Sequence, residues 1–97
     1  MVLKVKWTPR ATKNFHKSTI YILENWGKFS ANVYINRVFA IIELIRKNPS
    51  IGFLYDSERR IYGFVISKHT SLFYKLESDA IIVLNIFDNK RNPKSRI

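Results

Sequence analysis

The chain has 97 residues, a length that predicts a single domain over residues 1–97. A hydrophobic content of 46% excludes wholesale disorder, the lack of cysteine excludes disulfides and thiolate chemistry, and the lack of a long apolar run predicts a cytoplasmic protein with no membrane partner. Seventeen Lys and Arg against seven Asp and Glu give a formal net charge of +10, which favours nucleic acid, the ribosome or an acidic protein as partner.

The N-terminal part of the chain predicts a strand followed by a helix. Residues 2–7 alternate apolar and basic side chains, which is typical of a strand with two different faces. Thr8 and Pro9 then form a helix-start signal, because Thr caps free backbone N–H groups and Pro fits the first helical position. The helix is expected to end at Gly27. Its predicted buried stripe consists of Ala11, Phe15, Thr19, Ile22, Leu23 and Trp26.

A second helix is predicted over residues 30–48, with Ser30 as its N-cap and Pro49 just after its end. Because the link between the two helices is short, they are expected to form an antiparallel hairpin. Residues 50–58 are interpreted as a loop that is unusually rich in apolar side chains. The predicted buried stripe of the second helix consists of Tyr34, Val38, Ile41, Ile42 and Ile45.

Three strands are predicted in the C-terminal half. Residues 59–67 form the first, and residues 72–77 and 80–87 form a β-hairpin around a polar turn. The last strand is nearly all apolar, so we expect it inside the sheet, with contact to solvent at Asn85 alone. The order β-α-α-β-β-β predicts an α+β fold in which a helical hairpin packs on one face of a small, mostly antiparallel sheet.

Few chemical sites are compatible with this composition. His16 and His69 lie far apart in sequence, acids are few and cysteine is absent, so no metal site and no cofactor is predicted. The three glycines are isolated and do not form a phosphate-binding loop. Cleavage of RNA without a metal remains possible, since Lys, Arg and His can transfer protons and stabilise a charged phosphorane.

The order of these elements, with the closing segments FYKL and IFDNKRNP, resembles the RelE/ParE superfamily of bacterial toxins. The resemblance implies a RelE/ParE-like fold and a growth-inhibiting toxin of a type II toxin–antitoxin, or plasmid-stabilisation, system. It also implies an acidic cognate antitoxin that binds the toxin in a hetero-oligomer. We expect Tyr62, Phe64 and Phe73 to share the outer face of the sheet, where an antitoxin segment could cover them.

In the RelE-like branch, basic residues on the outer sheet face cut mRNA on the ribosome. The positions that match this pattern hold Tyr62, Phe64 and Ser71, none of which is basic, and the terminal tyrosine of that branch has no counterpart. The arginine that follows the last strand is matched by Arg91. If the chain is such an RNase, the catalytic candidates are Lys75, His69 and Arg91.

This departure favours the ParE-like branch, which is associated with inhibition of DNA gyrase and not with RNA cleavage. The target is then expected to contact Lys90, Arg91 and Lys75. Two alternatives stay open. One is a ribosome-dependent, metal-free mRNA endonuclease, and the other is a basic nucleic-acid-binding module whose affinity falls steeply with salt.

Overall fold

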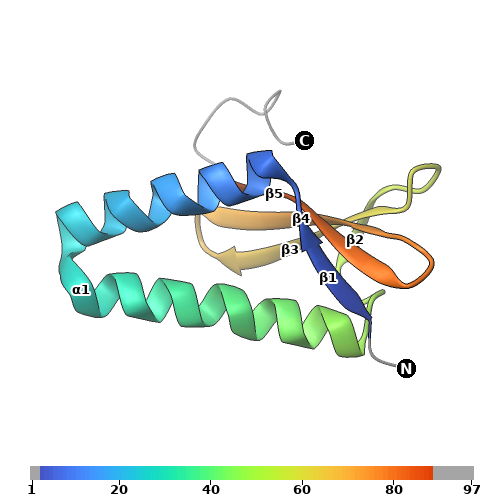
Figure 1. Ribbon diagram of the computed structural model, residues 1–97, viewed down its shortest axis with the longest axis horizontal. Helices are drawn as coiled ribbons and strands as arrows, with labels where there is room; N and C mark the ends of the chain where they lie inside the picture. Colours follow the sequence, from blue (N-terminus) through green and yellow to red (C-terminus); the bar gives the residue numbers. More distant parts are fainter. Residues whose placement is uncertain (1–2, 89–97) are drawn as a thin grey trace.

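The computed structural model describes residues 3–88, which form a five-stranded sheet and a helical hairpin (Figure 1). The strand order is β1-β5-β4-β3-β2, with β1 parallel to β5 and the other neighbours antiparallel. The predicted α+β class and the mostly antiparallel sheet are therefore confirmed. The elements are β1 (Lys4–Trp7), α1 (Pro9–Lys47), β2 (Phe53–Asp56), β3 (Ile61–Ser67), β4 (Thr70–Leu76) and β5 (Ala80–Asp88).

The element α1 is bent at Gly27 into two antiparallel limbs, residues 9–26 and 28–47 (Figure 1). Gly27 has φ 92° and ψ 176°, a conformation that glycine adopts readily because it has no Cβ. A Cβ at this position would meet no atom within 4 Å, so backbone conformation and not space makes glycine the suitable residue. The predicted hairpin is confirmed, but Ser30 is not its second N-cap, because the helix resumes directly after Gly27.

The start of α1 is tied to the sheet by Thr8. Its Oγ1 accepts a hydrogen bond from the Ala11 N–H at 3.1 Å, which confirms the predicted N-cap. The same hydroxyl donates to the Leu84 carbonyl of β5 at 3.0 Å. One side chain therefore fixes both the first turn of the helix and its position against the central strands.

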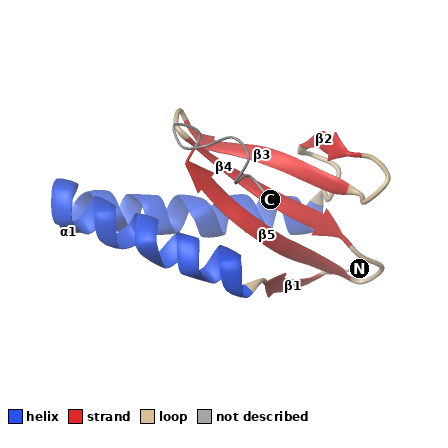
Figure 2. Ribbon diagram, turned by 90° about the horizontal axis from the view of Figure 1, so that it is seen from above, coloured by secondary structure: helices blue, strands red, loops and turns tan. Residues whose placement is uncertain are grey.

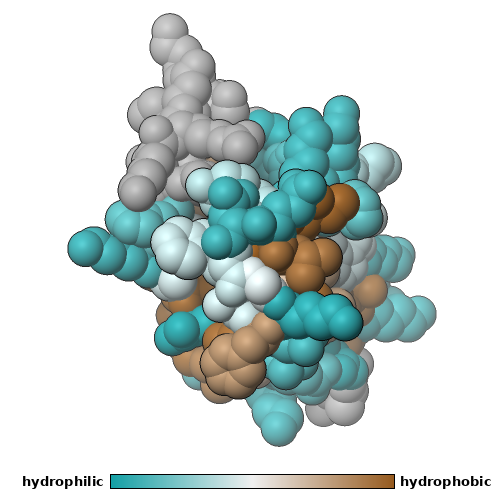
Figure 3. All heavy atoms as spheres, turned by 90° about the vertical axis from the view of Figure 1, so that its left-hand side faces the viewer, coloured by the Kyte–Doolittle hydropathy of each residue, from teal (hydrophilic) through white to brown (hydrophobic). Residues whose placement is uncertain are grey.

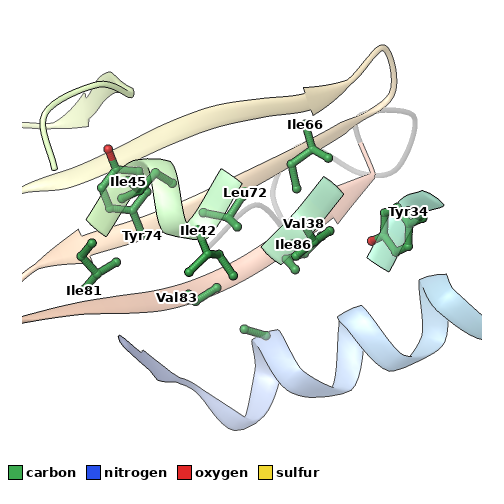
Figure 4. Close-up of a cluster of buried hydrophobic side chains, with 11 residues drawn as sticks. Tyr34, Val38, Ile42, Ile45, Ile66, Leu72, Tyr74, Ile81, Val83 and Ile86 are labelled. Atoms are coloured by element: carbon green, nitrogen blue, oxygen red, sulfur yellow. The ribbon is translucent and has the colours of Figure 1, made fainter. Parts of the chain in front are cut away.

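The hydrophobic core lies between the helical hairpin and one face of the sheet, with both limbs on the same side (Figures 2 and 4). Two residues of the predicted buried stripe, Leu23 and Trp26, are instead exposed, Trp26 by 69%. The prediction that these two side chains are buried is wrong, because the hairpin extends past the end of the sheet (Figure 1). The core consists of Ala11, Tyr34, Val38, Ile42, Ile45, Ile66, Leu72, Tyr74, Ile81, Val83 and Ile86.

Two further expectations are corrected by the structure. Residues 50–58 are not all loop, since β2 pairs with β3 and places Phe53 opposite Gly63. A Cβ on Gly63 would lie 2.3 Å from the Phe53 ring, so glycine makes room for this pairing. Asn85 is fully buried and does not reach solvent. The Asn85 Oδ1 accepts a hydrogen bond from Asn14 Nδ2 of α1 at 2.7 Å. The helix therefore supplies the hydrogen bond that we expected from water.

Candidate functional site

The strand register shows which side chains face away from the helices. Tyr62 pairs with Tyr74, and their rings stack with centroids 5.5 Å apart. Phe64 pairs with Leu72. Because Tyr74 and Leu72 belong to the core, Tyr62 and Phe64 face the helices and pack against that core. The expectation that Tyr62, Phe64 and Phe73 share the outer face is therefore wrong: both faces of β3 are apolar, so alternation alone could not orient it.

An apolar patch does lie on the outer face, near the β2 edge of the sheet. We call Phe53, Tyr55, Val65 and Phe73 the outer patch. Phe73 is its floor, only 2% exposed, with the ring of Phe53 at 6.2 Å and that of Tyr55 at 5.1 Å, both edge-on. Phe53, Tyr55 and Val65 are about half exposed. Of the three residues expected to bind an antitoxin, Phe73 alone lies on this face, and two residues of β2 cover it.

Three lysines lie on the outer face near the opposite edge, and we call them the lysine row: Lys4, Lys6 and Lys75. Ile82 of β5 pairs with Lys75 on one side and with Lys6 on the other. Two strand spacings of about 4.8 Å put the Cα atoms of these lysines roughly 10 Å apart. Lys6 was not singled out from the sequence, because the β1–β5 pairing that brings it near Lys75 joins distant parts of the chain.

The lysine row is only weakly neutralised within the chain. Lys4 Nζ lies 3.7 Å from an Asp79 carboxylate oxygen, and Lys75 Nζ lies 3.7 Å from one of Glu77. All four side chains are more than a third exposed, and such surface pairs contribute only about 0–1 kcal/mol. An anionic partner could therefore displace these contacts at little cost.

Two of the three candidates for RNA cleavage, His69 and Lys75, lie within the described residues and are far apart. His69 is exposed in the turn between β3 and β4, whereas Lys75 lies near the far end of β4. Six residues of strand separate them by about 20 Å. The third candidate, Arg91, and the target-binding candidate Lys90 lie outside the described residues. Asp88, the last residue of β5, pairs with Thr70 beside the His69 turn.

Tyr74 anchors the segment that leads from α1 into β2. Its hydroxyl donates to the Pro49 carbonyl at 2.7 Å and accepts from the Gly52 N–H at 3.1 Å. Burial raises the pKa of this hydroxyl, although the hydrogen bond from Gly52 opposes the change. The raised pKa therefore reflects the buried position of this hydroxyl, which serves as a structural contact at the sheet edge that carries the outer patch.

Within residues 3–88 the side chains offer no metal-binding group, and the helices offer no membrane span. No three His, Asp or Glu side chains in this part of the chain come together in a group that could hold a metal ion. No helix in the same part is long and apolar enough to cross a membrane.

Comparison with known proteins gives one family and several related structures. Residues 5–93 match the family model of the ParE toxin of the type II toxin–antitoxin system parDE. No curated protein sequence matches the chain.

Several solved structures have a similar fold. A structure of a chromosomal ParDE system from P. aeruginosa has a TM-score of 0.73 at 15% identity, covering 90% of this chain and 96% of that one. A YoeB/ParE toxin from Agrobacterium tumefaciens has a TM-score of 0.64 at 11% identity, covering 89% and 98%. A YoeB–YefM complex from Staphylococcus aureus has a TM-score of 0.58 at 14% identity, covering 89% and 95%. These similarities confirm the RelE/ParE-like fold.

Proposed function

The chain belongs to the family of ParE toxins of type II toxin–antitoxin systems, and we propose that it arrests bacterial growth by binding and inhibiting DNA gyrase, without cutting RNA. The match of residues 5–93 to the ParE toxin model supports the class of target, and the distance between His69, in the turn before β4, and Lys75, near its far end, argues against RNA cleavage. Cleavage of RNA needs a base, an acid and a phosphate-stabilising cation around one phosphate. Groups about 20 Å apart cannot share that phosphate.

The sheet positions that match the basic residues of the RelE-like branch also argue for a binding function. Tyr62 and Phe64 face the helices and pack against the core, and Ser71 is buried. None of the three offers a charge to a phosphate. The outer face instead presents a lysine row at one edge and an apolar patch at the other, a combination suited to holding a surface.

We propose that the target contacts Lys75 together with Lys90 and Arg91. Lys75 lies in the lysine row, where its pairing with Glu77 is long and partly exposed. Complementary charge raises the association rate and makes it sensitive to salt. Binding to the target should therefore weaken as ionic strength rises, without abolishing the apolar part of the contact.

We further propose that an acidic antitoxin neutralises the chain in a hetero-oligomer. The formal net charge of +10 supports an acidic partner. The similar fold of the toxin–antitoxin complex YoeB–YefM supports a protein partner. Tyr62 and Phe64 are not proposed as antitoxin contacts, because they pack against the core on the helix side of the sheet.

The test uses the purified chain in two assays run side by side. Supercoiling of relaxed plasmid by bacterial DNA gyrase should stop at near-stoichiometric amounts of the chain, while mRNA in a translating extract stays intact. Lys75→Ala and Arg91→Ala should each weaken the inhibition, while Lys13→Ala, an exposed lysine of α1, should not.

Two other results would replace the proposal. Cleaved mRNA with unaffected supercoiling would establish the ribosome-dependent RNase. Tight, steeply salt-dependent binding to nucleic acid, with neither assay affected, would establish the plain binding module.

A further inference from the structure

The strand β2 ends the sheet and leaves one side of its backbone without a partner strand. The strand order places β2 and β1 at opposite edges (Figure 2), and within residues 3–88 β2 pairs with β3 alone. An unpaired edge presents backbone N–H and C=O groups that another strand can bind. We call Phe53, Leu54 and Tyr55 the free edge. None of them is Lys or Pro, two residue types that often block strand pairing.

The free edge is apolar on both faces of the sheet. Phe53 is 50% exposed, Leu54 is 56% exposed and Tyr55 is 42% exposed. Phe53 and Tyr55 belong to the outer patch, whereas Leu54 pairs with Tyr62 and therefore lies on the helix side. A strand that joins this edge covers apolar side chains on both faces at once. The edge therefore suits a partner strand that is itself apolar.

The charges around the free edge favour a second copy of the chain as that partner. Residues 48–66 hold two acids, Asp56 and Glu58, and two bases, Arg59 and Arg60, so their formal net charge is zero. Arg59 Nε lies 2.7 Å from Asp56 Oδ2, which neutralises this pair locally. A neutral edge attracts neither nucleic acid nor an acidic protein, and it does not repel an identical neutral edge.

The positive charge of the rest of the chain lies away from the free edge. Lys4 and Lys6 are on β1, four strand spacings or about 19 Å from β2. That distance exceeds the Debye length of about 8 Å at physiological salt, so solvent ions screen these charges. Lys75, the nearest member of the lysine row, is two strands away, and its Nζ lies 3.7 Å from a Glu77 carboxylate oxygen.

We propose that the chain forms a twofold dimer in which the free edges of two copies pair as antiparallel strands. A twofold axis at Leu54 places this residue opposite its own copy and places Phe53 opposite Tyr55 of the second copy. Aromatic side chains that face each other across an antiparallel pair are favourable. The same residues meet twice, as a twofold interface requires. The proposal depends on the geometry of the edge and not on the target of the toxin.

The expected dimer is weak. β2 has four residues, and the register shift between Leu54 and Asp56 leaves few of them in regular pairing. The half-exposed rings of Phe53 and Tyr55 offer roughly 100 Å² each. A standard interface buries about 800 Å² on each partner, so this one is small. We therefore expect a dissociation constant on the order of 10–100 µM.

Sedimentation velocity of the purified chain, from about 5 to 500 µM, measures this association. The wild type should pass from monomer to dimer, and the dimer should tighten when salt rises from about 50 to 500 mM, because salt screens the repulsion between two basic molecules. Leu54→Lys and Leu54→Glu each place two like charges at the twofold axis. Each should therefore weaken the association at least about tenfold.

Leu23→Lys is the matched control. It makes the same change in charge and size at a leucine that is 44% exposed on α1, about one turn before the bend at Gly27. Figure 3 views this end of the hairpin, where hydrophilic side chains surround apolar ones. Because a helix has no free backbone edge to which a strand could add, Leu23→Lys should dimerise as the wild type does.

A mixture of the two Leu54 variants tests the twofold axis itself. In equal amounts, Leu54→Lys and Leu54→Glu place opposite charges opposite each other at the axis, so the mixture should recover association that neither variant shows alone. A variant that failed to fold could not be recovered in this way. Circular dichroism of each variant checks the fold independently.

Three results would overturn the proposal. A wild type that stays monomeric at the highest concentration and salt would remove the dimer. An equal loss in Leu23→Lys, or no recovery in the mixture, would place the contact away from the free edge. A monomeric wild type whose inhibition of gyrase is lost in both Leu54 variants would assign the free edge to the target.

Discussion

The hydroxyl of Tyr74 offers a sharp test of how the β2 edge is held. Tyr74→Phe removes one hydrogen bond to the Pro49 carbonyl and one from the Gly52 N–H. At about 0.5–1.5 kcal/mol for each bond, the free energy of unfolding should fall by about 2 kcal/mol. For a domain of this size that corresponds to a fall of roughly 10 °C in Tm.

Calorimetry and amide hydrogen exchange measure this effect, with Tyr62→Phe as the control. Tyr62 stacks on Tyr74 and, within residues 3–88, forms no hydrogen bond through its hydroxyl. Tyr74→Phe should also speed exchange at Gly52, whose N–H loses its acceptor. Equal Tm values for the two variants, with unchanged exchange at Gly52, would refute the idea that this hydroxyl anchors the edge.

Three further predictions concern stability. Because burial raises the pKa of Tyr74 in the folded state, its stabilising effect should be complete below about pH 10 and be lost above it; unfolding in urea from pH 8 to 11 should show this loss in the wild type and a smaller loss in Tyr74→Phe. Gly27→Ala and Gly27→Asn should each destabilise by about 1–3 kcal/mol, as measured by thermal unfolding, because φ 92° with ψ 176° lies in a region that essentially glycine alone adopts; Tm values equal to that of the wild type would contradict this. Thr8→Ala should cost about 1 kcal/mol as a lost N-cap, and the exposed Thr12→Ala should cost little in the same assay; the reverse order would refute the capping role.

Local signals in the sequence were sufficient for the helical hairpin. The Thr8–Pro9 start depends on neighbouring residues alone, and so does the break at Gly27. The alternating and apolar runs likewise located β3, β4 and β5 to within a few residues. These features need no knowledge of what packs against them.

Features that depend on tertiary pairing were not predictable in the same way. The sequence of β2 does not alternate between apolar and polar side chains. The strand pairs with β3, where Gly63 leaves room for the Phe53 ring opposite it. Tyr62 and Phe64 could not be assigned to a face, since β3 is apolar on both. Lys6 reaches the neighbourhood of Lys75 only through a pairing between the two ends of the described chain.

The candidate surfaces also combine features that local sequence predicts with features that depend on tertiary pairing. Lys75 was identified from the sequence as an exposed lysine on a strand, and the structure adds its neighbours in the lysine row. The exposure of Phe29 and Val33 was not predictable, because their spacing is that of a helix face whichever way that face points. The end of the sheet, which leaves Trp26 uncovered, is a property of the assembled fold.

The most direct test of the central claim follows synthesis in a bacterial host during the first minutes after the chain is induced. Labelled thymidine and labelled amino acid are added together, and their incorporation is measured in parallel. A gyrase inhibitor predicts that thymidine incorporation falls first while amino-acid incorporation continues. An immediate fall in amino-acid incorporation, with DNA synthesis continuing, would contradict the account and make the ribosome the target.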